Sequence, residues 1–211
     1  MNILAMDCTH GTCSAAFFNG TEAVSEIVEE MEYGQAERLI PMVCEVLAQA
    51  QVGFKDLNAV AVTVGPGSFT GVRVGLAAAD GIALAAGLPM TGVSVCEVLA
   101  WKTYRKMPDA DKVCIVLETK RDDYYIQFFE AGKAVTEPAA LSARELKNTD
   151  GYVFAGNAVD RLAEEIGNIS VADVSMPTAA DVALFACGKT PELKYPEPLY
   201  LREAEVTLCR K

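Results

Sequence analysis

One stretch in the first half of the chain constrains the fold more than any other. Residues 58–64 (NAVAVTV) form a short, valine-rich run, which is typical of a strand buried on both faces of a sheet. The run enters a glycine-rich segment, residues 65–71, and then an almost wholly apolar stretch that continues to Ala86. A buried strand, a tight loop and a helix in this order predict an α/β protein.

Further elements are predicted on both sides of this unit. Before it we expect strands at 2–7, 12–18 and 21–30, a hairpin at Asn19-Gly20, and an amphipathic helix at 36–50. After it we expect strands at 112–118, 124–130 and 151–155, and helices at 142–147, 158–166 and 179–187. A polar segment, residues 102–112, separates the two sets. We therefore place a domain boundary there, between residues 1–106 and residues 107–211.

Composition bounds what the protein can bind. Half of the 211 residues are hydrophobic, which is enough for a substantial core. With 18 basic against 29 acidic residues, the net charge of −11 repels polyanions, so direct binding of a nucleic acid is not expected. The best candidate for a nucleic-acid patch is the cluster of Lys102, Arg105 and Lys106 near Trp101, and a solvated helix end is the alternative.

The cysteines and the N-terminus predict a compartment. The seven cysteines are scattered and form no CxxC pair, which suits reduced thiols better than a disulfide framework or a zinc site. The first residues contain no basic region followed by a cleavage site, and we expect no segment to span a membrane. The sequence therefore predicts a cytoplasmic protein.

The apolar helix predicts close packing on more than one side. Between residues 71 and 86 only Arg73 and Asp80 are charged. Gly71, Gly75 and Ala79 recur every four residues, so another backbone can approach closely along one line. From periodicity alone, that neighbour is either this chain's own sheet or a partner protein.

The glycine-rich segment is a candidate anion site. It joins a strand to a helix N-terminus, where free amide groups favour negative charge. Gly65, Gly67, Ser68 and Thr70 would form such a loop, but the segment lacks the Gly-Lys-Ser/Thr ending of a P-loop. The alternative is that these glycines only allow a tight turn.

No residue set predicts catalysis. Asp7, followed by several hydroxyl residues, resembles half of a kinase or ATPase phosphate site, but the second acidic turn is missing at residues 116–120 (VLETK). Asp7 is then expected to hydrogen-bond within its own turn. His10 is the only histidine, so no two-histidine metal site is available, and a turn role is expected for it. We expect no catalytic residue, no metal and no cofactor.

Several motifs together resemble one known family. The most specific is Gly65-Pro-Gly-Ser-Phe-Thr-Gly-Val-Arg-Val-Gly75, and supporting stretches are residues 1–7, 39–43, 88–94 and 198–202. Through these motifs the chain resembles the TsaB family along most of its length. The resemblance implies an actin/Hsp70-like (ribonuclease H-like) two-lobe fold with a reduced second lobe. Two departures are Gln35, where many relatives have a histidine, and Glu118-Thr119-Lys120, where Asp-Ala-Arg is usual.

The resemblance also implies a function. It implies a non-catalytic subunit of the machinery that attaches threonylcarbamoyl to a tRNA adenosine next to the anticodon, with a TsaD-like catalytic subunit and a TsaE-like ATPase as partners. Contact with tRNA is then indirect, and a homodimer is expected in isolation. The expected interface is Leu39, Val43, Leu47, Gly71, Arg73, Gly75 and Ala79.

This interface gives a first mutational expectation. A bulky residue at Gly75, or loss of Arg73, is expected to weaken association and to leave the fold largely intact. The alternatives from other classes are a nucleotide-binding ATPase, which would release ADP without a partner, and a hydrolase, which would require a bound metal or a nucleophile–base pair.

Overall fold

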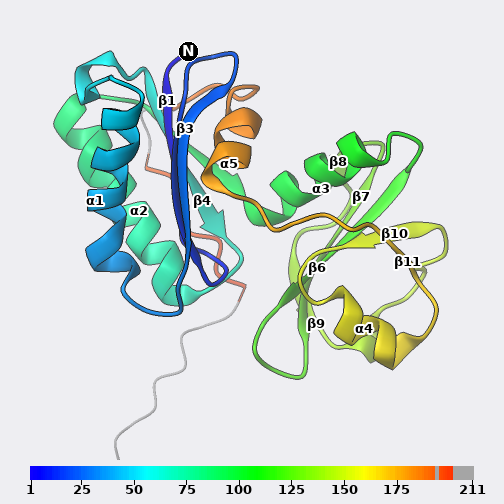
Figure 1. Cartoon of the computed structure of the whole chain (residues 1–211). Coiled ribbons are helices and arrows are strands. Elements are labelled where there is room, and N and C mark those ends of the chain that lie inside the picture. The colour runs from blue at the N-terminus through cyan, green and yellow to red at the C-terminus, as the bar shows by residue number, and fades with distance from the viewer. Residues whose placement is uncertain (193–194, 202–211) are drawn as a thin grey trace, which may run out of the picture.

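A five-stranded sheet organises the first half of the molecule. The structure is a computed structural model that describes residues 1–192 and 195–201 (Figure 1). Its first sheet has the strand order β3-β2-β1-β4-β5. The strands are β1 (Ile3–Asp7), β2 (Thr12–Phe18), β3 (Ala23–Glu30), β4 (Ala59–Gly65) and β5 (Met90–Ser94). The first three strands pair antiparallel, whereas β1, β4 and β5 pair parallel.

The predicted hairpin lies at the edge of this sheet. β1 and β2 pair from Ile3 opposite Phe18 to Asp7 opposite Ser14. Between β2 and β3 the side chain of Asn19 accepts hydrogen bonds from the backbone amides of Thr21 and Glu22. This side-chain turn holds residues 20–22 out of the ladder, so β3 begins at Ala23 rather than at the predicted Thr21.

Helices cover both faces of the first sheet. α1 (Gln35–Gln49) and α2 (Phe69–Ala86) pack on one face over a large apolar cluster, and the one-turn helix η1 (Phe54–Asp56) lies between α1 and β4 in sequence. α5 (Ala179–Ala186) covers the other face (Figure 1). Because β1 and β4 are buried on both faces, their sequences are almost continuously apolar, and for β4 this burial was predicted from the sequence.

A second, smaller sheet forms the other lobe. Its order is β11-β10-β6-β7-β8, and β9 also pairs with β7. α3 packs on one face and α4 on the other (Figure 1). The elements are α3 (Val95–Lys106), β6 (Lys112–Glu118), β7 (Tyr124–Glu130), β8 (Lys133–Ala134), β9 (Ala139–Leu141), η2 (Ala143–Glu145), β10 (Tyr152–Ala155), α4 (Val159–Ile166) and β11 (Ser170–Val171).

Two parts of this region differ from the sequence prediction. The segment 102–112, predicted as a polar separator, begins inside α3, which follows β5 directly. Ser94 and Glu97 cap the start of α3 reciprocally. The predicted helix 142–147 is only the short η2 turn, which ends because Leu146 has an extended backbone.

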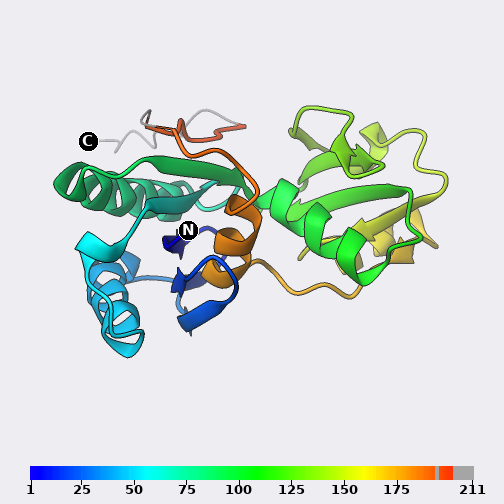
Figure 2. The same ribbon diagram turned by 90° about the horizontal axis from the view of Figure 1, so that it is seen from above.

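The end of the described chain returns to the first lobe. After the second sheet, α5 packs on the first sheet, Glu192 bridges to Met90 at the start of β5, and the Leu199 amide donates to the Val64 carbonyl at 2.7 Å. Seen from above, this segment runs along the outside of the first lobe (Figure 2). The division into residues 1–106 and 107–211 remains a prediction. Within the second of these ranges, α5, Glu192 and Leu199 contact the first lobe.

Among the described residues, α2 is the one helix long and apolar enough to cross a membrane by length and composition alone. Core helices of soluble proteins pass the same test, and one side of α2 is buried on β4 and β1.

Candidate functional site

The loop between β4 and α2 is held by backbone contacts within the chain. The Ser68 amide donates to the Thr9 carbonyl at 2.8 Å, and the Ser68 hydroxyl accepts from the Gly71 amide at 3.2 Å. A Cβ atom at Gly67 would lie 2.6 Å from the Thr9 oxygen, and one at Gly71 would lie 1.8 Å from the Cys8 oxygen. The two glycines therefore let the β1–β2 turn approach the start of α2, which gives them a packing role.

The predicted anion loop has few backbone donors left for a bound anion. Gly65 has a φ of +107° and lies against Leu199, whereas Gly67, Ser68 and Thr70 line a cleft. Because Ser68 and Gly71 already use their amides, fewer donors are left for an anion than the sequence suggests. The anion site remains a prediction.

Asp7 is satisfied inside the first lobe. Its Oδ1 accepts hydrogen bonds from the Thr9 hydroxyl at 2.6 Å and from the Thr63 hydroxyl at 2.5 Å. Burial raises the pKa of the Asp7 carboxyl, and the two hydrogen bonds oppose part of that shift. The expectation that Asp7 bonds within its turn is confirmed, since its carboxylate is engaged by neighbouring hydroxyl groups.

A cleft of about 690 Å³ lies between the lobes. Both lobes and the C-terminal segment line this cleft. The lining residues from the first lobe are Thr9, His10, Gly11, Glu32, Gln35, Pro66, 67–70 and 72. Those from the second lobe are 118–121, Tyr125 and Asn157, and those from the C-terminal segment are 199–201. The cleft thus brings the glycine loop opposite the Glu118-Thr119-Lys120 turn, which is distant in sequence. Gln35 and that turn, the two family departures, line the same cleft.

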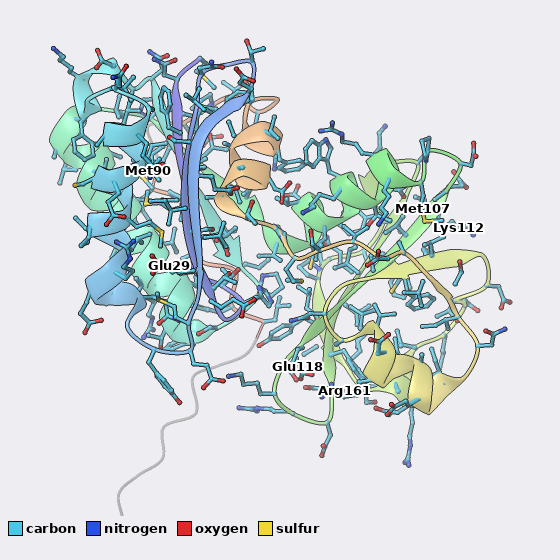
Figure 3. All side chains as sticks on the ribbon, viewed as in Figure 1. Glu29, Met90, Met107, Lys112, Glu118 and Arg161 are labelled. Atoms are coloured by element: carbon cyan, nitrogen blue, oxygen red, sulfur yellow. The ribbon has the colours of Figure 1, made fainter. Side chains whose placement is uncertain are left out.

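Arg161 fixes the turn on the second-lobe side. It forms an ion pair with Glu118 at 3.0 Å and donates to the carbonyls of Arg121 and Asp123. Figure 3 shows Arg161 and Glu118 side by side in the second lobe. The only carboxylate of this turn that lines the cleft is therefore already paired with a guanidinium.

His10 is poorly suited to acid–base chemistry. Its Nδ1 lies 3.0 Å from the Thr9 hydroxyl, and its buried Nε2 has no partner among the described residues. Burial lowers the pKa of the imidazole to about 4, so the ring is neutral at neutral pH. In residues 1–192 and 195–201, no three His, Cys, Asp or Glu side chains gather closely enough to hold a metal ion.

The predicted protein interface lies mostly inside the chain. Six of its seven residues, Leu39, Val43, Leu47, Gly71, Gly75 and Ala79, are buried beneath α1 and α2. Along α2 the small residues face the chain's own sheet, and a Cβ atom at Gly75 would lie 3.4 Å from Val62 of β4. The neighbour left open by periodicity is therefore this chain itself. Because Gly75 is buried, we now expect a side chain larger than alanine there to enter the core and to destabilise the fold, in contrast to the expectation from sequence.

The seventh residue, Arg73, contacts the C-terminal segment. Its guanidinium carbon lies 3.6 Å from the centre of the Phe69 ring, and its Nε donates to the Tyr200 hydroxyl at 3.0 Å. The Phe69 and Tyr200 rings also contact each other, with centres 5.1 Å apart. Arg73 thus ties residue 200 to the start of α2. Arg202, the last residue of the family motif, lies outside the described residues.

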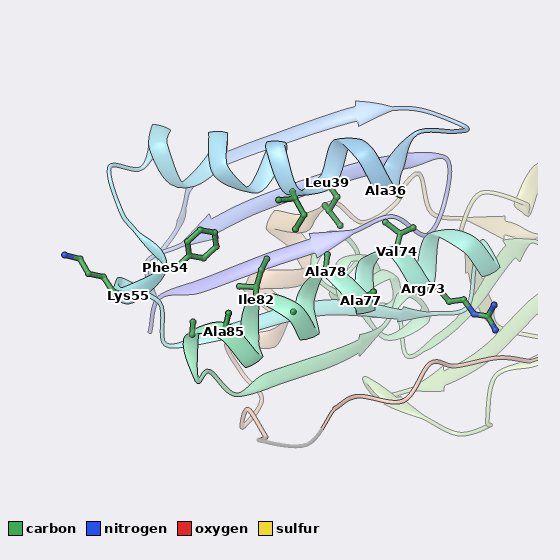
Figure 4. A pocket seen from close by; sticks show the side chains of 13 residues that line it. Ala36, Leu39, Phe54, Lys55, Arg73, Val74, Ala77, Ala78, Ile82 and Ala85 are labelled. Atoms are coloured by element: carbon green, nitrogen blue, oxygen red, sulfur yellow. The ribbon is translucent and has the colours of Figure 1, made fainter.

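An apolar groove opens between α1 and α2 on the outer side of the helices. Its volume is about 930 Å³, and its lining carries only two charged side chains, Lys55 and Arg73 (Figure 4). The other lining residues are Ala36, Leu39, Ile40, Phe54, Val74, Ala77, Ala78, Gly81, Ile82, Ala85 and Ala86. We call this surface the α1/α2 groove. Two residues of the predicted interface, Leu39 and Arg73, line this groove, whereas the other five are buried on the inner sides of the helices, and the interface remains a prediction.

The basic cluster near Trp101 is partly neutralised. Lys102 forms an ion pair with Asp181 at 2.5 Å, and Lys106 pairs with Asp173. Arg105 lies over the Trp101 ring at 4.7 Å. With two of three cations paired to carboxylates, this region holds α3 to the chain that leads into α5.

The architecture defines a class of protein. Two α/β lobes around a cleft, with a β-β-β-α-β-α first lobe, constitute the actin/Hsp70-like fold. At 12% identity the chain superposes on component A of (R)-2-hydroxyglutaryl-CoA dehydratase from Acidaminococcus fermentans with a TM-score of 0.53, covering 90% of this chain and 98% of that one. At this identity the similarity concerns the fold alone.

Closer comparisons define the family. The profile of the family described as TsaD, tRNA N6-adenosine threonylcarbamoyltransferase, matches residues 29–190. The tRNA threonylcarbamoyladenosine biosynthesis protein TsaB of Escherichia coli is 34% identical over 96% of this chain and 95% of its own length. The structure of YeaZ from Pseudomonas aeruginosa has a TM-score of 0.80 at 26% identity, covering 95% of this chain and 99% of that one. The chain belongs to the TsaB family, and its pathway is tRNA threonylcarbamoyladenosine biosynthesis.

Proposed function

We propose that this chain is a non-catalytic subunit that binds a TsaD-like catalytic subunit through the α1/α2 groove. The observation that carries the proposal is the groove itself. On a chain with a net charge of −11, it is a broad surface with two cations and no anion in its lining. Extended apolar surfaces on soluble proteins commonly mark protein-binding sites.

The exposure of individual side chains supports this proposal. Leu84, on the outer side of α2, is 80% exposed, and Ile40 on α1 is 44% exposed. Leaving such side chains in water forgoes roughly 1.5–3 kcal/mol each relative to full burial. A partner helix laid along the groove would cover Ile40, which lines it, whereas Leu84 lies on α2 outside the lining.

The match to the TsaD family supports a partner of the same architecture. The matched range, residues 29–190, includes both α1 and α2. A partner with an equivalent helix pair can pack its own pair against this one with approximate two-fold symmetry. The same geometry allows two copies of this chain to pair when the catalytic partner is absent, so we also propose a homodimer in isolation.

The inter-lobe cleft supports the non-catalytic part of the proposal. Asp7 is engaged by two hydroxyl groups, Glu118 is paired with Arg161, and His10 is neutral. Asp7 and Glu118 cannot act as a general base or receive a metal without first losing a partner, and a pKa of about 4 makes the His10 ring a weak base. Catalysis would then reside in the TsaD-like subunit, with a TsaE-like ATPase as a further partner and tRNA contacted through the complex.

The test is a binding measurement with substitutions on the outer side of α2. Gly81 is exposed, lines the groove, and has open space where a Cβ atom would stand. Gly81→Leu and Ala77→Asp, the second at an exposed alanine of the same lining, are therefore expected to keep the fold and to weaken binding to the TsaD-like subunit at least tenfold, about 1.4 kcal/mol. Titration calorimetry measures the affinity, and light scattering follows the homodimer.

A matched control keeps the test specific. Val135 is 50% exposed and lies in the second lobe, away from the groove, so Val135→Asp should leave the affinity unchanged. Threonylcarbamoylation of tRNA, reconstituted with TsaD-like, TsaE-like and adenylate-forming enzymes, should require this chain and fall with the groove variants alone. Unchanged affinity and modification in folded Gly81→Leu and Ala77→Asp proteins would contradict the proposal.

A second candidate function is nucleotide or phosphate binding in the inter-lobe cleft. The observation that favours it is the 690 Å³ volume beside Gly67, Ser68 and Thr70 at the start of α2, with Lys120 across the cleft. Titration with ATP, ADP and inorganic phosphate tests it, with Thr70→Val as the variant. Binding that Thr70→Val weakens would support a cleft ligand, ADP release by the isolated chain would support an ATPase, and no heat of binding would exclude both.

A further inference from the structure

Two buried cysteines meet at the end of the β1–β2 hairpin. The thiol of Cys8 donates a hydrogen bond to the sulfur of Cys13, with the sulfur atoms 3.6 Å apart. Both side chains are almost fully buried in the apolar cluster beneath α1 and α2. Among the described residues, no other pair of cysteines shares such a hydrogen bond. The pair plays no part in the proposed docking function.

The backbone places these residues at a spacing that a disulfide can bridge. The ladder between β1 and β2 ends with Asp7 opposite Ser14, and Cys8 and Cys13 occupy the next position of the same register. Opposed residues of antiparallel strands have Cα atoms about 4.5–5.5 Å apart, within the range of about 4.4–6.8 Å found in disulfides. The sulfur atoms need to approach from 3.6 Å to about 2.05 Å, which side-chain rotation can supply.

We propose that Cys8 and Cys13 form a redox-active dithiol that a peroxide oxidises reversibly to an intramolecular disulfide. The connecting residues Thr9, His10 and Gly11 line the inter-lobe cleft, so the thiols lie directly behind a turn that contacts solvent. Local opening of this turn admits a molecule as small as hydrogen peroxide. The inference does not depend on the α1/α2 groove or on any partner.

The roles of the two sulfurs follow from their hydrogen bond. Because Cys8 donates to Cys13, the pKa of Cys13 is lowered and that of Cys8 is raised, so Cys13 is the first nucleophile. Its thiolate attacks one peroxide oxygen, the O–O bond breaks, and the leaving hydroxide takes up a proton to become water. The Cys8 thiol then attacks the sulfenic sulfur, loses its proton, and expels the hydroxyl group as a second water. Two thiols lose two electrons, and one peroxide is reduced to two waters.

A peptide-mapping experiment on the full chain tests the proposal without any substitution. Arg38 is the first basic residue, so trypsin releases residues 1–38 as one peptide that contains Cys8, Cys13 and no other cysteine. The protein is treated with hydrogen peroxide, freed of residual peroxide, unfolded in guanidinium chloride so that buried thiols become accessible, alkylated with iodoacetamide and digested. We expect this peptide to lose the mass of two hydrogen atoms and to carry no alkyl group, and we expect dithiothreitol to restore two alkylation sites. Methionine oxidation adds oxygen and is distinguished by mass.

Other cysteines provide the controls. Cys44 is exposed, so its oxidation reports that the peroxide dose was effective. If Cys8 and Cys13 both remain alkylatable at a dose that oxidises Cys44, the proposal is overturned. Sulfinic or sulfonic acid at either position in place of the disulfide would also overturn it. Cys44→Ser should leave the disulfide unchanged, whereas Cys13→Ala should abolish the two-hydrogen loss and leave Cys8 alkylatable.

Discussion

His10 is kept uncharged by its burial in the fold. Its pKa of about 4 in the folded chain compares with about 6.5 for a free imidazole, because burial penalises the charged ring. As the pH falls from about 6.5 to about 4, the unfolded chain takes up a proton that the folded chain does not. The neutral His10 ring therefore makes its full contribution to the free energy of unfolding above pH 6.5. Acidification from pH 6.5 to 4 lowers the free energy of unfolding by roughly 3 kcal/mol at most.

Denaturant unfolding at several pH values measures this effect. Between pH 6.5 and 4, His10→Asn should lose less stability than the unsubstituted chain, since asparagine does not titrate. Asp7, whose pKa is raised, acts in the opposite direction and is common to both proteins, so it cancels in the difference. Parallel pH profiles for the two proteins would show that the ring is not the titrating group.

Gly75 and Gly81, which lie on the buried and the exposed side of α2 respectively, allow effects on folding to be distinguished from effects on binding. Gly75→Leu forces a large side chain against Val62 and should destabilise the fold by about 1–3 kcal/mol or more. Gly81→Leu places the same side chain in open space and should keep or raise stability, because leucine favours helix. Thermal unfolding of both variants checks this, and equal melting temperatures would contradict the assignment of α2 faces.

Residue identities at the site were predictable, but their neighbours were not. The glycine motif, Asp7 and Arg73 could all be found from sequence spacing. Their actual contacts, with Thr9, Thr63 and Tyr200 respectively, join segments that are separated in sequence by up to 127 residues. Local periodicity contains no information about such separations, so the inner and outer sides of α2 were not distinguished.

The start of α3 has a capping motif that can be recognised in the sequence. Ser94 accepts a hydrogen bond from the Cys96 amide, and Glu97 accepts one from the Ser94 amide, which completes a reciprocal cap. The Ser-x-x-Glu pattern at residues 94–97 could have predicted this helix. It was missed because the apolar residues of α3 contact two lobes at once, which weakens a single amphipathic stripe.

This cap gives a prediction at the scale of the element. Ser94→Ala removes the side-chain acceptor and should lower the free energy of unfolding by about 1 kcal/mol. Ser94→Asp, which can still cap, should preserve most of the stability. Urea titration of the two variants measures the difference, and an Ala variant as stable as the Asp variant would show that the cap contributes nothing.

Strands and helices with strong patterns were predicted well, and elements that depend on tertiary pairing were not. β1, β2, β4, β6 and β7 and helices α1, α2, α4 and α5 were confirmed within about two residues at most ends. The short strands β8, β9 and β11 were missed because two or three residues carry too little periodicity. β5 was missed because glycine and threonine interrupt its apolar run.

At the scale of the molecule, the chain leaves the first lobe, forms the second lobe and then returns to the first. α3 packs on the second sheet, while α5, which follows that sheet in sequence, packs on the first. Lys102 connects the two helices through its 2.5 Å ion pair with Asp181. The first lobe is therefore completed by a helix that follows the second lobe in sequence, whereas the second lobe, α3 to β11, is one continuous piece of chain.

Truncation tests this arrangement. A chain ending at residue 178 loses α5 and exposes the apolar face formed by Ile3, Ala16, Phe18, Ala61 and Val93. Such a chain should fail to give a cooperative unfolding transition, or should aggregate. Circular dichroism during heating provides the measurement. A truncated chain that melts as cooperatively as the complete one would mean that the first lobe is stable without residues 179–211.

The late position of α5 has a consequence during synthesis. The ribosome releases the first five strands long before it releases the helix that covers one face of their sheet. For the time needed to translate roughly the second half of the chain, which is several seconds at about 5–20 residues per second, that face remains open to nascent-chain chaperones. Folding of the first lobe is thus tied to the completion of translation.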